Sequence, residues 1–309
     1  MLVMFPGQGS QKIGMGKDIF DESATAREVF QEVDEAISFK LSDLIFNGNE
    51  TDLKATQNAQ PAIMATSIAF FRTLQKDFGF NVAQKAKFFA GHSLGEYSAL
   101  CAAGVLSLSD TAKILRARGQ AMAQAFPSGG AMAAIIGLAP DIVEQIATES
   151  SDNERVVQVA NDNSVGQIVI SGHKEAVQLA IGKAKERGAK MATLLEVSGP
   201  FHSKLMEPAV KILSETLAQI HFDEPTNPII SNVTAQAENK NFKTLLEKQI
   251  TSPVRWRESI IFAQDNGVTT CIEIGPGKVL AGLAKRTVPS LRLVNINSLD
   301  TLKNYENLP

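Results

Sequence analysis

Short apolar runs alternate with segments of helical periodicity along most of the chain. Residues 2–5 (LVMF) and 87–90 (KFFA) are each followed by a glycine-containing turn, so both are predicted to be buried strands. Helical patterns cover residues 26–37, 61–78, 95–103 and 109–126, the last of which begins at a Ser109/Asp110 cap. Apolar segments after Pro228 and at 271–274 resume the strand–loop–helix order, with a helix from about Val279. This alternation predicts an α/β fold with a parallel sheet.

The middle of the chain has a different order of elements. Strands are predicted at 131–138, 156–160, 167–171 and 191–197, and helices from Pro140 and at 174–187. A polar Asn/Asp/Ser/Gly turn is expected between the two central strands. The order β-α-β-β-α-β is that of a ferredoxin-like unit. We therefore expect an α/β-hydrolase-like main domain at 1–127 and 198–309, interrupted by a small ferredoxin-like α+β subdomain at 128–197.

Composition narrows the class of protein without identifying it. With 309 residues, 44% apolar and 20% charged, the chain has the size and composition of a globular enzyme with more than one core. The net charge of −3 provides no general attraction to nucleic acid or anionic membranes, and no apolar run approaches the ~20 residues of a membrane span. The N-terminus lacks the pattern of a signal peptide, and Cys101 and Cys271 lie in apolar surroundings typical of buried thiols. We expect a cytoplasmic protein that binds neither nucleic acid nor membrane.

The segment Gly-His-Ser-Leu-Gly at residues 91–95 matches the G-x-S-x-G nucleophile elbow. It lies between a predicted strand and a predicted helix, which is the context that gives the motif its meaning. The sharp turn exposes the serine hydroxyl at the positive end of the following helix, where a developing oxyanion is favoured. The motif predicts that Ser93 is a nucleophile; a plain tight turn is the alternative.

Acyl transfer also requires two N–H donors for the oxyanion. The amide of Leu94, directly after the predicted nucleophile, is the usual first donor. The glycine-rich segment PGQGS at residues 6–10 follows a strand and allows close backbone approach, so it is a candidate for the second. A generic strand-to-helix turn and a phosphate-binding loop are the other interpretations, although the segment lacks the Lys-Ser/Thr ending of a P-loop.

Four histidines compete for the role of general base. His92 is adjacent to the serine and is expected to brace the elbow, His173 is expected to start a helix, and His221 lies in a polar, solvated stretch. His202 follows a Gly-Pro turn at the expected domain junction, where a side chain is well placed to face a cleft. A capping or core histidine remains the alternative for His202. A catalytic histidine needs an acceptor on its far nitrogen; no Asp or Glu is indicated by motif, and a backbone carbonyl could serve instead, giving a dyad rather than a triad.

The helix predicted at 109–126 carries two arginines on different faces. At 100° per residue, Arg118 falls on the apolar side with Leu115 and Met122, whereas Arg116 falls on the opposite side and is expected to be solvated. A charge on an apolar stripe needs a partner. Arg118 is therefore predicted either to form a structural ion pair or to bind a substrate carboxylate in bidentate geometry.

These motifs together resemble the malonyl-CoA:acyl-carrier-protein transacylase family of bacterial fatty-acid synthesis. The resemblance rests on FPGQGSQ (5–11), NAQPAI (58–63), GHSLGEYSAL (91–100), RARGQAM (116–122), GPFHSKLM (199–206), Q-x-x-x-PV-x-W (249–256) and EIGPGKVLAGL (273–283). It covers nearly the whole chain, with the motifs in the family's order.

The resemblance implies a role for each matching position. Ser93 would be the nucleophile and His202 the base, and the backbone carbonyl of Gln249 would orient the histidine. The amides of Gln8 and Leu94 would form the oxyanion hole. The residues expected to bind substrate are Arg118, through the malonyl carboxylate, with Met122, Asn161, Phe201 and His92.

The resemblance also implies the reaction. Malonyl would pass from malonyl-CoA to Ser93 and then to the phosphopantetheine thiol of acyl carrier protein, in a ping-pong scheme that uses both thioesters as substrates and no cofactor. Because acyl carrier proteins are acidic, a basic docking patch is expected, with Lys190, Lys285 and Arg286 as candidates. The competing hypotheses are a serine thioesterase or esterase and a non-catalytic acyl-CoA-binding protein.

Overall fold

Two sheets organise the chain, and the computed structural model describes residues 1–304. The strands are β1 (Leu2–Phe5), β2 (Phe88–Gly91), β3 (Gly130–Ile136), β4 (Val157–Ser164), β5 (Gln167–His173), β6 (Met191–Leu194), β7 (Ile229–Ile230), β8 (Ala237–Glu238), β9 (Thr270–Ile274) and β10 (Arg292–Ile296). The helices are α1 (Lys17–Glu22), α2 (Ala24–Ala36), α3 (Leu41–Asn47), α4 (Glu50–Lys54), α5 (Thr56–Lys76), α6 (Val82–Lys85), α7 (Leu94–Ala102), α8 (Leu108–Ala125), α9 (Pro140–Glu149), α10 (Lys174–Glu186), the 3-10 turn η1 (Lys204–Met206), α11 (Glu207–Ala218), α12 (Phe242–Gln249), α13 (Trp256–Asp265), α14 (Val279–Thr287) and α15 (Leu299–Lys303).

The larger sheet has the strand order β10-β9-β1-β2-β7-β8 and is parallel except for β8. Side chains of β1 alternate between its two faces, as the pleat requires. Val3 and Phe5 pack into one apolar cluster, whereas Leu2 and Met4 pack into the other, and all four are fully buried. A short strand that is apolar at every position therefore forms the centre of a sheet covered on both sides.

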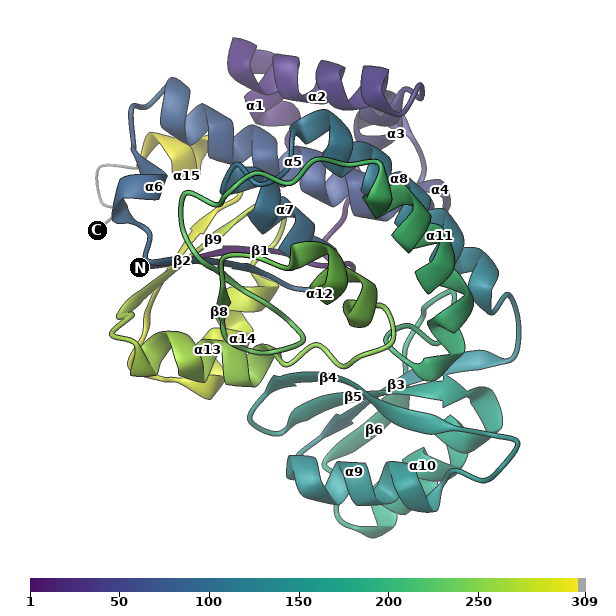
Figure 1. The fold of residues 1–309 in the computed structure, drawn as a ribbon. Coiled ribbons are helices and arrows are strands. Elements are labelled where there is room, and N and C mark those ends of the chain that lie inside the picture. Colours follow the sequence, from purple (N-terminus) through teal and green to yellow (C-terminus); the bar gives the residue numbers. More distant parts are fainter. Residues whose placement is uncertain (305–309) are drawn as a thin grey trace.

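Helices cover the two faces of this sheet unequally. The cluster containing Phe5 includes residues of α2, α5, α7, α8 and α11, and these helices lie together above the sheet in Figure 1. The cluster containing Met4 is built mainly on α13 and α14, on the other side. The α/β fold with a parallel sheet predicted from the sequence is confirmed.

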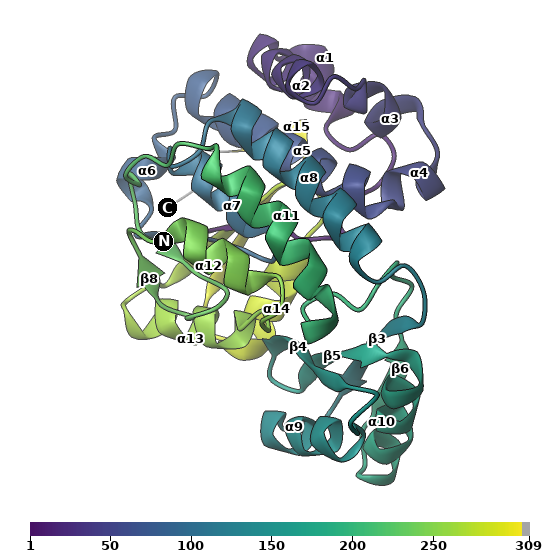
Figure 2. The ribbon, with the colours of Figure 1, turned by 45° about the vertical axis from the view of Figure 1, so that its right-hand side comes forward.

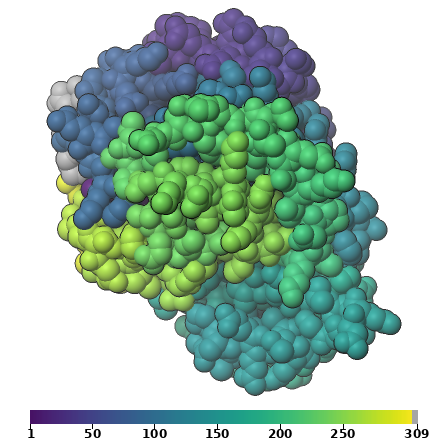
Figure 3. Space-filling view, viewed as in Figure 1, coloured from purple at the N-terminus to yellow at the C-terminus, as the bar shows by residue number. Residues whose placement is uncertain are grey.

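The smaller sheet is antiparallel throughout, with the order β4-β5-β3-β6. Helices α9 and α10 pack on one face, where they share a separate apolar core with the strands (Figure 2). This order and the β-α-β-β-α-β connectivity match the expected ferredoxin-like unit. The unit forms the teal lobe at the lower right of Figure 3 and lies inside the interval 128–197 proposed for the subdomain.

The polar turn expected after residue 160 was wrong. Strand β4 continues to Ser164, and only Val165 and Gly166 connect it to β5. The polar side chains of this segment are buried because they meet the larger lobe: Asn161 bridges to Val254, and irregular pairing with β5 accompanies this contact. Polarity here marks an interface between the two lobes instead of a solvent-exposed turn.

Two helix starts also differ from the prediction. Helix α5 begins at Thr56, so Pro61 lies within it and leaves the carbonyl of Gln57 without its usual i+4 donor. The guanidinium of Arg116 donates to that carbonyl (Nη1–O 3.0 Å) and is half-buried, so the solvated position expected for Arg116 was wrong. Helix α8 begins at Leu108, two residues before Asp110, and Ser107 caps it.

Both cysteines are free thiols; Cys271 is buried and Cys101 is only partly buried. None of the helices within residues 1–304 combines the length and apolar character needed to cross a membrane.

Candidate active site

The turn between β2 and α7 holds Ser93 in a strained backbone conformation. Its φ and ψ are 53° and −109°, a region that costs a non-glycine residue about 1–3 kcal/mol. Glycine is required on both sides. A Cβ on Gly91 would lie 1.9 Å from the carbonyl carbon of Gly95, and a Cβ on Gly95 would lie 2.2 Å from the carbonyl oxygen of Phe5. The two glycines of the motif therefore allow the turn to pack against β1.

The hydroxyl of Ser93 forms a chain of hydrogen bonds with His202 and Gln249. Ser93 Oγ lies 2.8 Å from His202 Nε2, and His202 Nδ1 lies 2.9 Å from the backbone carbonyl oxygen of Gln249. A carbonyl oxygen only accepts, so Nδ1 carries the proton and Nε2 accepts from the serine hydroxyl. This tautomer is the one that a general base needs.

His202 is neutral in this setting. Its ring is buried, and burial, followed by the positive charge of Arg118, lowers the pKa of His202 to about 3. The backbone at His202 also has a positive φ of 56°, which orients its side chain toward the elbow from the segment between β6 and η1. The imidazole is thus unprotonated near neutral pH, with the lone pair of Nε2 available to the serine hydroxyl.

Arg118 is fully buried beside the serine, and the acceptors around its guanidinium are uncharged. Nη1 donates to Gln60 Oε1 (2.6 Å), while Nη2 donates to Gln249 Oε1 (3.0 Å) and Ser93 Oγ (3.1 Å). The Nε atom has no hydrogen-bond partner in the part of the chain that the structure describes, and the guanidinium lies 5.3 Å from the ring centre of Tyr97. Within residues 1–304 no carboxylate lies within ion-pair distance of Arg118. The cation can therefore accept a carboxylate from a ligand.

A cavity of about 450 Å³ opens in front of these groups. Predicted residues that line it are Gln8, His92, Ser93, Arg118, Met122, Asn161, Phe201 and His202. Leu94 and Gln249 are buried just outside this lining. The structure therefore brings the predicted catalytic and substrate-binding residues together at one cavity, including Ser93, His202 and Arg118.

The loop after β1 lies directly against the elbow. A Cβ on Gly7 would be 2.7 Å from the carbonyl oxygen of His92, so only glycine allows this approach. Gln8 follows at the cavity wall, and its side chain donates to Thr56 Oγ1 (3.3 Å). Leu94 is the first residue of α7, where helix amides have no acceptor within the helix. Both segments therefore lie next to Ser93, the region from which the sequence predicts the two oxyanion donors.

The remaining predicted residues form the walls of the cavity. His92 Nε2 lies 2.8 Å from Asn163 Oδ1, and burial lowers the pKa of His92. Its ring is 5.7 Å from that of Trp256, so His92 connects the elbow to β4 and α13. The sulfur of Met122 accepts from Gln60 Nε2 (3.8 Å), behind Arg118.

A buried carboxyl group, that of Glu96, lies behind the site. Glu96 is buried in the first turn of α7, and burial raises its pKa to about 7. Its Oε2 accepts from the side-chain amide of Gln249 (2.7 Å) and from the backbone N–H of Asn232 (3.1 Å). Glu96 thus anchors the residue that carries the carbonyl for His202.

Sequence reasoning did not assign Gln60, Glu96, Tyr97, Asn163 or Asn232 to the site. The first three lie inside motifs already singled out, and a glutamate or glutamine among apolar helix residues is itself a signal of a buried polar network. Asn163, near the end of β4, and Asn232, just after β7, carried no signal of burial. Their positions depend on how these strands pair, which the sequence does not specify.

Within residues 1–304, the His, Cys, Asp and Glu side chains form no group of three or more arranged to hold a metal ion. The site consists of a serine with a neutral histidine, backbone N–H groups at a helix start and one buried cation. Together with the fold, these features are typical of enzymes that transfer acyl groups through a serine.

The chain belongs to the acyl transferase domain family, because the sequence model of that family matches residues 3–306. It is 47% identical over 303 residues to the malonyl CoA-acyl carrier protein transacylase of Bacillus subtilis, covering 97% of this chain and 94% of that protein. The crystal structure of the acyl-carrier-protein-S-malonyltransferase from Bartonella henselae is similar, with a TM-score of 0.95 and 49% identity over 98% of this chain and 97% of that one. A solved structure described as a type II PKS acyl-carrier protein in complex with its malonyl-transacylase contains a similar chain. The TM-score is 0.94 and the identity 38%, over 98% of this chain and 97% of that one.

Proposed function

We propose that this protein transfers the malonyl group from malonyl-CoA to the phosphopantetheine thiol of an acyl carrier protein, and so supplies fatty-acid elongation. The observation that carries the proposal is the guanidinium of Arg118, which lies buried 3.1 Å from Ser93 Oγ and has no carboxylate partner among residues 1–304. Malonyl differs from acetyl by one carboxylate, and a bidentate guanidinium recognises that group. The names of the similar proteins support the same substrate pair.

In the first half-reaction, Ser93 Oγ attacks the thioester carbonyl while its proton passes to His202 Nε2. The carbonyl of Gln249 stabilises the imidazolium that forms. The amides of Gln8 and Leu94 stabilise the tetrahedral oxyanion, and each such donor contributes on the order of 10²–10³ in rate. The C–S bond then breaks, and the CoA sulfur leaves with the proton from His202.

The second half-reaction reverses these steps with a different thiol. His202 removes the proton of the phosphopantetheine thiol, the sulfur attacks the malonyl ester of Ser93, and the serine regains its proton. Both steps use side chains and backbone groups of this chain, and we propose that no cofactor takes part. The two free thiols are in keeping with the reducing cytoplasm that we propose as the location.

The docking surface for an acidic carrier protein is proposed on the side of the small lobe that faces α14. Lys190 and Arg286 line a groove of about 780 Å³ there, together with Arg257. Val165 and Met191, which are exposed by 62% and 53%, line the same groove. Lys285 lies on the same helix and donates to the carbonyl of Pro289. Basic and apolar groups in one groove suit an acidic domain that also offers apolar contacts.

The proposed function is tested by intact-protein mass spectrometry after brief exposure to malonyl-CoA. The wild-type protein should gain one malonyl group and lose it when holo acyl carrier protein is added, whereas Ser93→Ala should gain none. Malonylated Ser93→Ala would overturn the assignment of the nucleophile. Catalytic release of malonate without a carrier protein would show a thioesterase instead, and an unmodified wild-type protein would show a protein that only binds acyl-CoA.

A further inference from the structure

Asn232 is a fully buried residue just after β7 that contacts the backbone on both sides of the nucleophile. Its Oδ1 accepts from the backbone N–H of Ser93 (2.8 Å), and its Nδ2 donates to the backbone carbonyl of Gly91 (2.7 Å). These two peptide groups define the elbow. Asn232 does not line the cavity, so any influence on the reaction must act through the residues that it contacts. Apart from the elbow these include Gln249, whose side-chain amide donates to Asn232 Oδ1 at the longer distance of 3.4 Å.

The two contacts require an amide side chain of this length. One side-chain terminus must donate to a carbonyl and accept from an N–H at the same time. A carboxylate accepts only, and glutamine would extend one methylene further into a packed region. The strained backbone of Ser93 persists only when its surroundings fix it, and Asn232 supplies two of the constraints.

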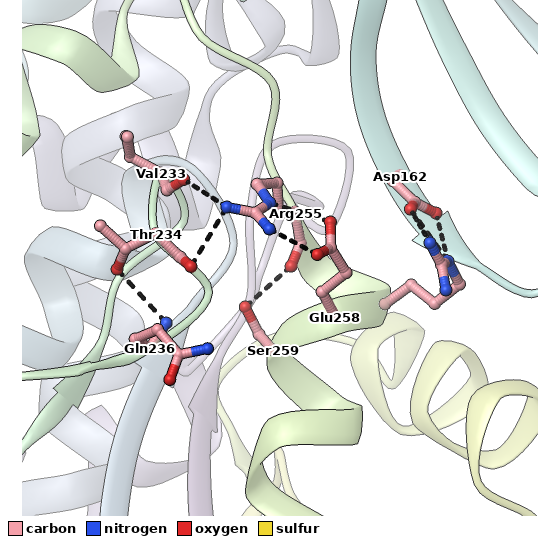
Figure 4. Close-up of polar contacts among 8 residues, drawn as sticks. Asp162, Val233, Thr234, Gln236, Arg255, Glu258 and Ser259 are labelled. Carbon is pink, nitrogen blue, oxygen red and sulfur yellow. Dashed lines mark hydrogen bonds and ion pairs between the residues drawn. The ribbon is translucent and has the colours of Figure 1, made fainter. Parts of the chain in front are cut away.

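Asn232 is itself held firmly. Its backbone N–H donates to Glu96 Oε2 (3.1 Å), and its carbonyl accepts from the backbone N–H of Arg255 (3.1 Å). The guanidinium of Arg255 holds the next two carbonyls, of Val233 and Thr234, at 3.1 and 3.2 Å, and also pairs with Glu258 (Figure 4). The segment after β7 is therefore a rigid support that reaches the elbow from the far side of β2.

We propose that Asn232 is a positioning residue for acyl transfer: by bridging Gly91 and Ser93 it holds the serine hydroxyl in line with His202. The proposal rests on the acylation of Ser93 put forward above. Oγ lies 2.8 Å from His202 Nε2 and 3.1 Å from Arg118 Nη2, and both distances depend on the φ and ψ of Ser93. Loss of the bridge lets the turn relax, which separates the nucleophile from its base.

The test replaces Asn232 by Asp, which keeps the size and the acceptor for Ser93 but loses the donor to Gly91. Asn227→Asp is a matched control, because Asn227 Nδ2 also bridges two backbone carbonyls, those of Ala83 and Ala86 (3.0 and 2.9 Å), in the same stretch of chain and outside the cavity lining. Both variants should lower the melting temperature. Only Asn232→Asp should slow malonylation of the folded protein, by about 10- to 100-fold in kcat with KM for malonyl-CoA nearly unchanged.

Equal acylation rates in the two variants, after correction for the folded fraction measured by circular dichroism, would reduce Asn232 to a structural residue. A rise in KM without a fall in kcat would likewise contradict positioning of the nucleophile. Asn232→Ala is measured in parallel and should show the same kcat defect, so a failure of the Asp variant to fold leaves a second measurement. A wild-type protein that forms no acyl-serine would refute the proposed function itself, and that result is distinct from any difference between the variants.

Discussion

A buried cation surrounded by neutral acceptors selects the acyl group in the proposed reaction. Replacing Arg118 by Ala should slow acylation of Ser93 by malonyl-CoA by about 10²-fold or more, because the substrate carboxylate loses a charged, desolvated partner. Acylation by acetyl-CoA should fall far less, since acetyl has no carboxylate. The measurement is the ratio of the two single-turnover rates in each protein. Equal losses for both substrates would show that Arg118 only supports the shape of the site.

A second residue-scale prediction concerns the buried carboxyl of Glu96, whose pKa is raised by burial from 4.5 to about 7. The folded state therefore disfavours its ionised form, and the associated stability is present at low pH and is lost as pH rises from about 4.5 to about 7. The Glu96→Gln variant lacks this loss. Its free energy of unfolding relative to the wild type should increase by about 3 kcal/mol between pH 4.5 and pH 8.

Urea denaturation of both proteins across this pH range gives the difference directly. A difference that stays constant with pH would mean that Glu96 ionises in the folded protein as it does in the unfolded one. Arg118, Gln249, Asn232 and Ser231 all face the carboxyl group and favour its ionised form. The change of the difference in unfolding free energy with pH therefore measures how far burial, which raises the pKa of Glu96, outweighs these contacts, which lower it.

Ser93 and Arg118 were accessible from the sequence because each breaks a local rule, whereas His202 was favoured by its place at the domain junction, and the roles of Gln8 and Gln249 came from the family resemblance. Ser93 lies between two glycines in a strand-to-helix turn, and Arg118 is a charge on an apolar stripe. Asn232 breaks no rule, since an asparagine after a short strand is ordinary. Its position opposite Gly91 is fixed only by the pairing of β7 with β2, which local sequence does not encode.

At the scale of elements, the sequence located strands better than their ends. The apolar runs of β1, β2 and β9 were found because burial on both faces makes them continuous. The end of β4 was misjudged because polar residues 161–164 are buried by the other lobe. A run of polar residues looks the same in the sequence whether it is buried at such an interface or exposed to solvent. Pro61 was taken as the start of a helix, although Arg116 satisfies the carbonyl that Pro61 leaves free.

Close packing of two helices gives Arg118 its position. Helix α8 crosses the start of α5 at Gly119, where a Cβ would lie 2.6 Å from the Cα of Gln57. This approach brings the guanidinium of Arg118 within reach of Gln60, on the first turns of α5. The glycine next to the arginine is thus part of the binding site through its lack of a side chain.

At the scale of the whole molecule, the two lobes are joined across the cavity. Asp162 on β4 accepts from the guanidinium of Arg257 on α13 through both oxygens, at 2.7–3.0 Å. The backbone N–H of Asp162 also donates to the carbonyl of Val254 (2.9 Å). The neighbours Asn161 and Asn163 line the cavity, so this junction sets its width.

Breaking the ion pair between Asp162 and Arg257 should lower the free energy of unfolding and weaken the binding of malonyl-CoA. A double-mutant cycle of Asp162→Asn and Arg257→Gln should give a coupling energy of about 1–3 kcal/mol in the free energy of unfolding, because the pair is bidentate and largely buried. KM for malonyl-CoA should rise in each single variant, since one wall of the cavity gains freedom. A coupling energy near zero would indicate that the backbone contact alone holds the lobes together.

The place of β1 between β2 and β9 has a consequence for biosynthesis. Strand β1 is translated before both of its neighbours, and the edge that faces β9 stays unpaired until residues 270–274 have been translated. At about 5–20 residues per second, the interval between β2 and β9 lasts on the order of 10–40 s. During that interval the nascent chain exposes an apolar strand edge of the kind that chaperones shield.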